Sequence, residues 1–191
     1  MVNRMRVLVG MLLLVGSLGQ TAFGGGLKLK EGSRLTYWVD YYGEQYDFIV
    51  TVKEIGEEGI KFDYRMTKLG TKGSVEITKG ALNQALGQEN TFRGGELVLS
   101  SKTTVWISRL VYSSLKGEGK VNVDVGEGTE TLVLKGKEKF EVEVDGKVKK
   151  MGVLLAETSE GKKFTITDDK KFPLILKMDL GWLIGIKSIN K

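Results

Sequence analysis

The side chains of this chain that could carry out chemistry are almost all carboxylates. The 191 residues include no His and no Cys. This excludes Ser-His and Cys-His nucleophile pairs, His zinc sites and His general bases. A glycosidase needs only two acids across a cleft, and the candidate acids are Asp168, Asp169 and Asp179, or Asp40 with Asp47.

These carboxylates also have a simpler interpretation. Asp168 and Asp169 open a loop before the only proline, and Asp40 and Asp47 fit strands with one solvated face. A calcium site at Asp168 and Asp169 would lack the regularly spaced ligands of a calcium-binding loop. No glycine-rich segment has the spacing of a phosphate or dinucleotide loop. We therefore assign no catalytic residue, no metal site and no cofactor, and we expect a protein that is not an enzyme.

Aromatic side chains form the second group of candidates. They crowd into the first predicted hairpin, on both faces of its first strand, and recur later in the chain, at Tyr37, Trp38, Tyr41, Tyr42, Tyr46, Phe48, Trp106 and Trp182. A strand that is aromatic on both faces needs cover on both, either from a helix or from a ligand in an apolar groove. For the ligand alternative, the binding residues that we predict are Trp38, Tyr42, Trp106 and Trp182.

The N-terminal segment differs in composition from the rest of the chain. Arg4 and Arg6 precede an uncharged apolar run at residues 7–18, and Ala22 and Gly24 place small residues where signal peptidase acts. A membrane span would need ~20 apolar residues, and this run is shorter. We expect residues 1–24 to be a signal peptide, residues 25–191 to form a single domain, and the mature protein to be periplasmic or secreted.

The charge and the cysteine content limit the classes of partner that we expect. Without Cys the mature N-terminus cannot be lipid-modified and no disulfide can form. The formal charge of +5 includes two arginines of the signal segment, and the remaining lysines alternate with acidic residues along the strands. Nucleic-acid binding would require a basic stripe with aromatic platforms. We expect no nucleic-acid partner, and contact with a membrane only peripherally, if at all.

Alternation of apolar and polar residues predicts a mainly β fold. About ten strands with short glycine turns are expected, at residues 34–42, 46–53, 60–67, 74–78, 97–99, 120–125, 131–135, 140–144, 148–155 and 164–167, before the closing segment. Asp145-Gly146 predicts a hairpin turn in which both residues take positive φ. A change of phase between Val148 and Met151 predicts a bulge at Lys149-Lys150.

Helical spacing occurs at two places. Residues 79–86 predict one or two turns, and residues 103–116 predict the main helix, packed on or in the sheet, with Ser101 or Thr103 as its N-cap. The strand propensity of residues 103–107 argues against an early start. Residues 172–189 are the most apolar run after the N-terminal segment and predict a final hairpin, bent at residues 179–181, that closes the sheet.

Three motifs resemble a family of bacterial envelope proteins of unknown function, whose fold is similar to the LolA-like half-barrel of the lipoprotein-localisation carriers. They are Gly-x-x-Leu-x-Tyr at residues 32–37, Trp-Ile-Ser-Arg at 106–109, and Asp-x-x-x-Pro-Leu-Ile-Leu-x-Met-x-x-Gly-Trp at 169–182. The resemblance implies a strongly curved antiparallel sheet, a half-barrel, wrapped round a helix. The carriers of that superfamily hold acyl chains in the concavity.

Three functional hypotheses follow. The first is a periplasmic binding protein for a hydrophobic or acylated ligand, with a large apolar cavity. The second is an envelope interaction or structural module that has a filled core and offers a sheet edge to another protein. The third is a carboxylate-dependent hydrolase, which would need two acids facing each other in a cleft.

Overall fold

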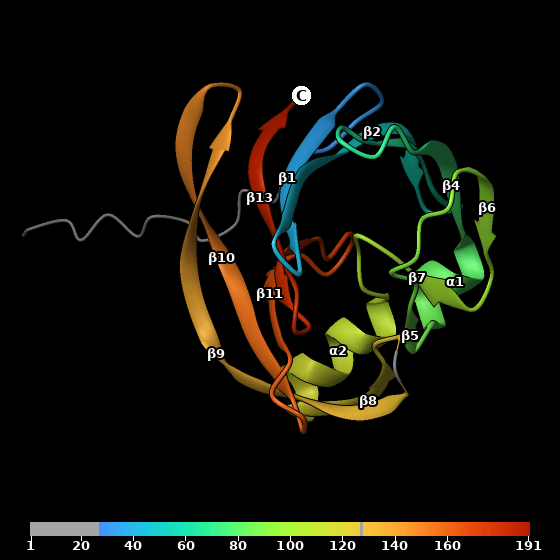
Figure 1. Cartoon of the computed structure of the whole chain (residues 1–191). Helices are drawn as coiled ribbons and strands as arrows, with labels where there is room; N and C mark the ends of the chain where they lie inside the picture. The colour runs from blue at the N-terminus through green and yellow to red at the C-terminus, as the bar shows by residue number, and fades with distance from the viewer. Residues whose placement is uncertain (1–26, 127) are drawn as a thin grey trace, which may run out of the picture.

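The computed structural model describes residues 27–126 and 128–191, so the predicted signal peptide lies outside the described residues. The described chain forms one large curved sheet of thirteen strands that is not closed into a barrel, and its two helices lie in the concavity (Figure 1). The predicted mainly β, strongly curved sheet with its main helix packed on or in it is therefore confirmed.

The strand count differs from the prediction in two ways: short strands at residues 87–88 and 102–103 join one end of the sheet, and the separate strands predicted at 131–135 and 140–144 form one continuous strand. The strands are β1 (Arg34–Tyr41), β2 (Glu44–Gly56), β3 (Gly59–Met66), β4 (Lys72–Thr78), β5 (Gly87–Gln88), β6 (Gly95–Leu99), β7 (Lys102–Thr103), β8 (Lys120–Asp124), β9 (Thr129–Val144), β10 (Lys147–Thr158), β11 (Lys163–Thr167), β12 (Ile175–Asp179) and β13 (Leu183–Asn190). Their spatial order is β6-β4-β3-β2-β1-β13-β12-β11-β10-β9-β8-β5-β7. Most neighbours are antiparallel, but the β4–β6, β5–β7 and β5–β8 pairs and an added β13–β9 contact are parallel, so the sheet is mixed.

The final hairpin lies at the centre of this sheet. β13 pairs with β12 on one side and with β1 on the other, opposing Leu35 to Ile189 and Val39 to Ile184. These residues alternate with polar ones along β1, so one face of the strand carries its aliphatic side chains into the core. The predicted final hairpin is present, and it lies inside the sheet, where its two strands join β1 to β11.

The turn and bulge predictions for β9 and β10 had different outcomes. Asp145 and Gly146 take φ of 52° and 73°, so both residues of the connecting turn are left-handed, as predicted. The bulge predicted at Lys149-Lys150 is wrong, because the register shift lies between Leu155 and Ala156, opposite an extra residue in β9. Val148 is 69% exposed and belongs to the other face, so the apolar residues from 151 onward need no change of phase.

The two helices fill part of the concavity. α1 (Lys79–Gln84) matches the predicted short helix. α2 (Arg109–Gly117) ends as expected but begins six residues later than predicted, because Thr103 belongs to β7 and Ser108 is the N-cap, its Oγ accepting from the backbone N of Val111 at 3.1 Å. The strand propensity of residues 103–107 therefore prevailed over their helical spacing.

The buried apolar side chains form two clusters. The larger cluster lies against β1, β2, β3 and β4, and the smaller one joins α2 to β8–β12. Trp182, just before β13, and Ile184, near its start, are half-buried and pack against both clusters. The central hairpin therefore connects the two parts of the core.

Trp38 lies over a glycine of the neighbouring strand. It opposes Gly185 in the β1–β13 pair, and a Cβ built on Gly185 would come within 2.6 Å of the Trp38 indole nitrogen and 2.8 Å of the adjoining ring carbon. Glycine at position 185 therefore leaves the space that the indole ring occupies.

We expect Gly185→Ala to lower the free energy of unfolding by about 1–3 kcal/mol, because the new methyl group and the indole cannot share this space. Urea unfolding measures the change. In a Trp38→Leu background the same substitution should cost clearly less, since the ring is gone. Gly136→Ala, where an added Cβ meets nothing within 4 Å, is the control. Equal costs of Gly185→Ala in both backgrounds would contradict a clash with the indole.

Candidate functional site

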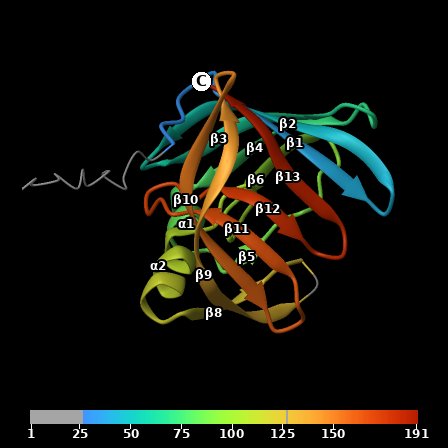
Figure 2. The same cartoon turned by 90° about the vertical axis from the view of Figure 1, so that its left-hand side faces the viewer.

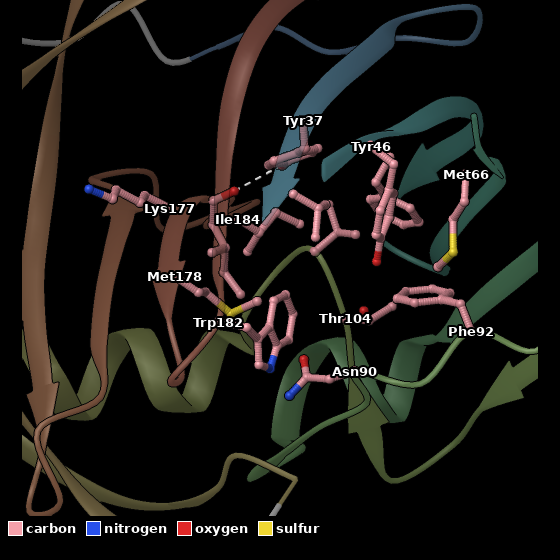
Figure 3. Close-up of a pocket in the computed structure, with 14 residues that line it drawn as sticks. Tyr37, Tyr46, Met66, Asn90, Phe92, Thr104, Lys177, Met178, Trp182 and Ile184 are labelled. Atoms are coloured by element: carbon pink, nitrogen blue, oxygen red, sulfur yellow. Dashed lines mark hydrogen bonds between the residues drawn. The ribbon is translucent and has the colours of Figure 1, made fainter. Parts of the chain in front are cut away.

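An apolar pocket lies between the concave side of the sheet and two irregular pieces of chain at residues 90–92 and 104–105 (Figure 3). Its lining is mostly aliphatic and aromatic, and consists of Tyr37, Val39, Tyr46, Phe48, Met66, Asn90, Phe92, Thr104, Val105, Ile175, Lys177, Met178, Trp182 and Ile184. The cavity volume is about 50 Å³. One water needs ~10–15 Å³ on this measure, so the pocket as it stands holds only a few atoms.

The loop that carries Phe92 forms one wall of the pocket. Its ring packs on Phe48 and on Tyr64, with ring centroids 4.8 Å apart in both cases. The Tyr64 hydroxyl accepts a hydrogen bond of 2.9 Å from the backbone N of Gly94, and Asn90 Nδ2 donates to the Val125 carbonyl at 2.8 Å. These contacts fix a loop that has no regular secondary structure against the sheet.

A few polar groups lie in this apolar lining. The Tyr37 hydroxyl donates to the Ile175 carbonyl at 2.9 Å, and burial raises its pKa far above the ordinary value, so it remains a donor. The side chains of Tyr46 and Asn90 reach toward the pocket from opposite sides in Figure 3. The pKa of Tyr46 is raised by burial first, and then by the nearby Tyr41 and Glu44. Such a lining suits a ligand that is mainly apolar with one polar group.

Another part of the pocket wall contains a strained turn at Val105. Its φ is 62°, and the backbone N of Trp106 donates to the Thr104 carbonyl at 2.6 Å, so residues 104–106 form a γ-turn with a left-handed central residue. A β-branched residue rarely adopts this conformation. Strain of this kind persists only where the surroundings enforce it, and it is common in ligand sites.

The residues after this turn are held from several directions. The Ser108 hydroxyl donates to the Ala85 carbonyl at 2.6 Å. The Arg109 guanidinium donates to the Lys171 carbonyl at 3.0 Å and to Asn83 Oδ1 at 2.7 Å, and it forms an ion pair with Glu57 at 3.0 Å. The segment that carries Val105 is therefore anchored to α1, to the β2–β3 turn and to the loop before β12.

The structure brings one of the four predicted ligand-binding aromatics to the pocket. Trp182 lines it. Trp106 is fully buried and packs on Phe62, with ring centroids 5.6 Å apart. Tyr42 is 73% exposed at the β1–β2 turn, and Trp38 covers Gly185. The latter three are not among the lining residues, and no ligand contact tests the role that we predicted for any of the four.

Most of the pocket residues were missed for an identifiable reason. Alternation along β1 places Leu35, Tyr37 and Val39 on one face and Trp38 on the other. The two aliphatic residues of the first set mark the core face, and that signal would have favoured Tyr37 over Trp38. Asn90 and Phe92 come from an irregular loop, and no periodicity in the sequence indicates where they lie.

The candidate carboxylates are occupied in turns and ion pairs. Asp40 accepts from the backbone N of Gly43, Asp179 from that of Gly181, and Asp169 from two backbone groups of its own loop. Asp47 pairs with Lys187. The pocket lining contains no acidic residue. Within residues 27–126 and 128–191, no group of three or more acidic side chains could hold a metal ion.

Asp168 belongs to a cluster that the sequence patterns did not reveal. Its carboxylate accepts from the Tyr112 hydroxyl at 2.5 Å and from Lys116 Nζ at 2.7 and 2.9 Å. Burial alone would raise the pKa of Asp168, but the hydrogen bonds from Lys116 and Tyr112 lower it below its ordinary value. Burial and the hydrogen bond to Asp168 raise the pKa of Tyr112 to about 12. The cluster ties α2 to the end of β11.

None of the helices in the described part of the chain has the length and apolar character needed to cross a membrane. No family model matches this chain, no curated protein is significantly similar to it, and no solved structure matches it significantly. The resemblance to envelope proteins with a LolA-like half-barrel therefore stays a prediction.

If Val105 is strained as described, Val105→Gly should be more stable than Val105→Ala by at least about 0.5 kcal/mol, because glycine adopts a positive φ without cost. In ordinary strand backbone the order is reversed. Val39, also in the pocket lining but in regular β1, is the matched control, and there the glycine variant should be the less stable one. Chemical unfolding gives the free energy of unfolding of the four variants. If the glycine and alanine variants have the same order of stability at positions 105 and 39, Val105 is not strained.

The second prediction concerns pH. Because the pKa of Tyr112 is about 12 in the folded protein and 10.0 is its ordinary value, its contribution to stability is complete below pH 10 and is lost as the pH rises toward 12. Tyr112→Phe cannot ionise, so it should lose less stability than the wild type between pH 10 and 12. The unfolding temperatures of the two proteins, measured between pH 10 and 12, test this prediction. If both temperatures fall equally with pH, the pKa of Tyr112 is not raised.

Proposed function

We propose that this chain is an exported, non-catalytic binding protein, periplasmic or secreted, that takes up a hydrophobic ligand of the acyl-chain class in the pocket beside Trp182. The observation that carries the proposal is the pocket itself. It combines an apolar and aromatic lining on the concave side of the sheet with the Tyr46 and Asn90 side chains. Export is supported by the signal-like composition of residues 1–24.

The size of the pocket restricts the ligand. An apolar cavity of ~150 Å³ is needed to hold a benzene ring, and this cavity measures about 50 Å³. A slender alkyl chain can begin to enter, and further entry requires side chains to move. Met66 and Met178 line the pocket and have flexible, unbranched side chains that can adapt to a ligand. We therefore propose that the ligand enters by its alkyl end and enlarges the pocket.

The polar residues suggest how the other end of the ligand is held. Tyr46, Asn90 and Trp182 are each partly exposed and also line the pocket. A carboxyl, ester or amide group that remained at the opening would meet the hydroxyl, amide and indole N–H groups of these residues. The pocket lining has no acidic side chain, and the candidate carboxylates form their hydrogen bonds and ion pairs outside the pocket. The arrangement therefore favours ligand binding over hydrolysis.

A second candidate function, an interaction module, is favoured by a different observation. β6 is an outer strand of the sheet and pairs with β4 alone, and its residue Val98 is 64% exposed. An unpaired edge of this kind can accept a strand from another envelope protein. The small volume of the pocket also agrees with the filled core that we expect of an interaction module.

Lauric acid at concentrations below micelle formation is a suitable probe for the first candidate. We expect the mature protein, purified without detergent, to bind about one molecule per chain in native mass spectrometry and to change its tryptophan fluorescence, because Trp182 lines the pocket. Ile184→Phe places a ring in the pocket and should weaken binding about tenfold or more, a change of about 1.4 kcal/mol.

Val148→Phe is the matched control, because it adds the same ring at an exposed site on β10. It should leave probe binding unchanged, and the thermal unfolding of both variants shows that they are folded. If the wild type binds no probe, or if both variants bind it equally well, acyl binding in this pocket is refuted and the interaction module becomes the better account.

A further inference from the structure

Several exposed apolar side chains gather at one end of the sheet. Tyr41 and Tyr42, at the β1–β2 turn, are 48% and 73% exposed, and Leu69, at the β3–β4 turn, is 50% exposed. Met66 at the end of β3 pairs with Phe48, so the β3–β4 turn lies at the same end of the sheet as the β1–β2 turn. Figure 2 shows the ends of β1 and β12 pointing to the same side. We call Tyr41, Tyr42, Leu69 and Trp182 the aromatic rim.

The aromatic rim is continuous with the pocket. The ring of Tyr41 packs edge-on against Tyr42, with centroids 4.8 Å apart, and against Trp182 at 5.9 Å. Trp182 lines the pocket with its neighbour Ile184. Tyr46, two residues into β2, lies in the same lining. A ligand that enters past Trp182 and Tyr46 would therefore come from the side on which the rim is exposed.

Tyr42 occupies a position that does not suit it as a turn residue. Tyr42 and Gly43 have φ of 52° and 89° between paired residues of β1 and β2, a turn that favours Asn or Asp in the first position. The β9–β10 turn has the same signs of φ and carries Asp145 there. A tyrosine at this position strains the backbone. Because its side chain is largely exposed, burial within the isolated protein does not explain why a tyrosine is there.

The charges near the rim indicate which partner fits. Asp40 and Glu44 flank the first turn and Asp179 precedes the third, whereas Arg65, Lys68 and Lys72 surround Leu69 at the second turn. Charges of both signs therefore lie near the rim, and they do not by themselves select an anionic lipid or a nucleic acid. Tyr and Trp combine an apolar ring with a polar tip, and they are the side chains enriched where a bilayer meets water.

We infer that the aromatic rim docks on the surface of a phospholipid bilayer, with the Tyr41, Tyr42 and Trp182 rings in the interfacial region and the pocket opening toward the lipid. This inference rests on the proposed function, because an acyl chain leaving a bilayer would then reach the pocket without crossing water. Docking is carried by the rings and not by charge, so it depends little on ionic strength.

The test uses vesicles of phosphatidylcholine and the processed protein, with its mass checked for removal of residues 1–24, since that apolar segment would bind lipid by itself. We expect the protein to float with the vesicles equally at low and high salt, and brominated lipid to quench Trp182, while Trp106, which is fully buried, is not quenched. Tyr42→Asn should lower the partition into vesicles about fivefold or more, and Tyr42→Trp should retain it.

Two controls separate docking by the rim from unfolding and from adhesion at any exposed apolar side chain. Tyr42→Asn suits the left-handed turn, so it should be at least as stable as the wild type, and weaker partition could not be attributed to unfolding. Val98→Ser removes an exposed apolar side chain from β6, away from the rim, and should not change partition.

The outcomes also distinguish the two proposals. If the Ile184→Phe variant no longer binds lauric acid but still floats with vesicles, both proposals hold. If the wild type binds lauric acid but does not float, or if Tyr42→Asn floats as well as the wild type, bilayer docking is overturned and the pocket proposal stands. If binding appears only with anionic vesicles and disappears in salt, charge and not the aromatic rim carries it, and the inference is likewise overturned.

Discussion

The backbone of residues 104–107 is buried inside the concavity without belonging to a long strand or helix, and its hydrogen bonds must still be satisfied. It satisfies them against residues 173–175. The backbone N of Ile107 donates to the Pro173 carbonyl at 3.0 Å, the N of Ile175 donates to the Val105 carbonyl at 2.8 Å, and Trp106 forms a bridge with Leu174. Pro173 suits this place because it has no N–H to satisfy and offers a carbonyl. This short contact joins two segments that are almost seventy residues apart, and the positions of α2, β12 and the pocket wall depend on it.

The same contact explains why the pocket is small and yet has a strained wall. Held from both sides, Val105 stays in a conformation that an isolated valine would leave, and its side chain belongs to the larger core cluster and lines the pocket. On the facing side, Trp182 and Ile184 pack against both clusters, so the pocket lies where two separately packed regions meet. Junctions of this kind can repack at lower cost than the centre of a single core, since fewer contacts cross them.

The fold could be largely predicted from the sequence, because period-two alternation directly reports strands with one buried face. It identified the hairpin turn at Asp145 and the final hairpin correctly. It failed where a non-local contact decided the outcome: residues 103–107 have helical spacing, but the hydrogen bonds between this segment and residues 173–175 keep it out of a helix. The site was harder to predict. Aromatic content drew attention to Trp38, whereas the core face of β1 is set by Leu35 and Val39, and Phe92 is placed by a hydrogen bond from its loop to Tyr64 that no local pattern encodes.

The pairing of β1 with β13 has a consequence for how the protein folds. Arg34 opposes Asn190, so the central pair of the sheet joins residues that are almost the whole described length of the chain apart. β2, β3 and β4 can form a meander as soon as they are available, but β1 lacks its second neighbour until the last residues of the chain arrive. Closing so long a loop is entropically costly and slows folding. The middle of the sheet is therefore its last part to assemble, and a chain that has lost its final few residues would keep an open seam beside its first strand.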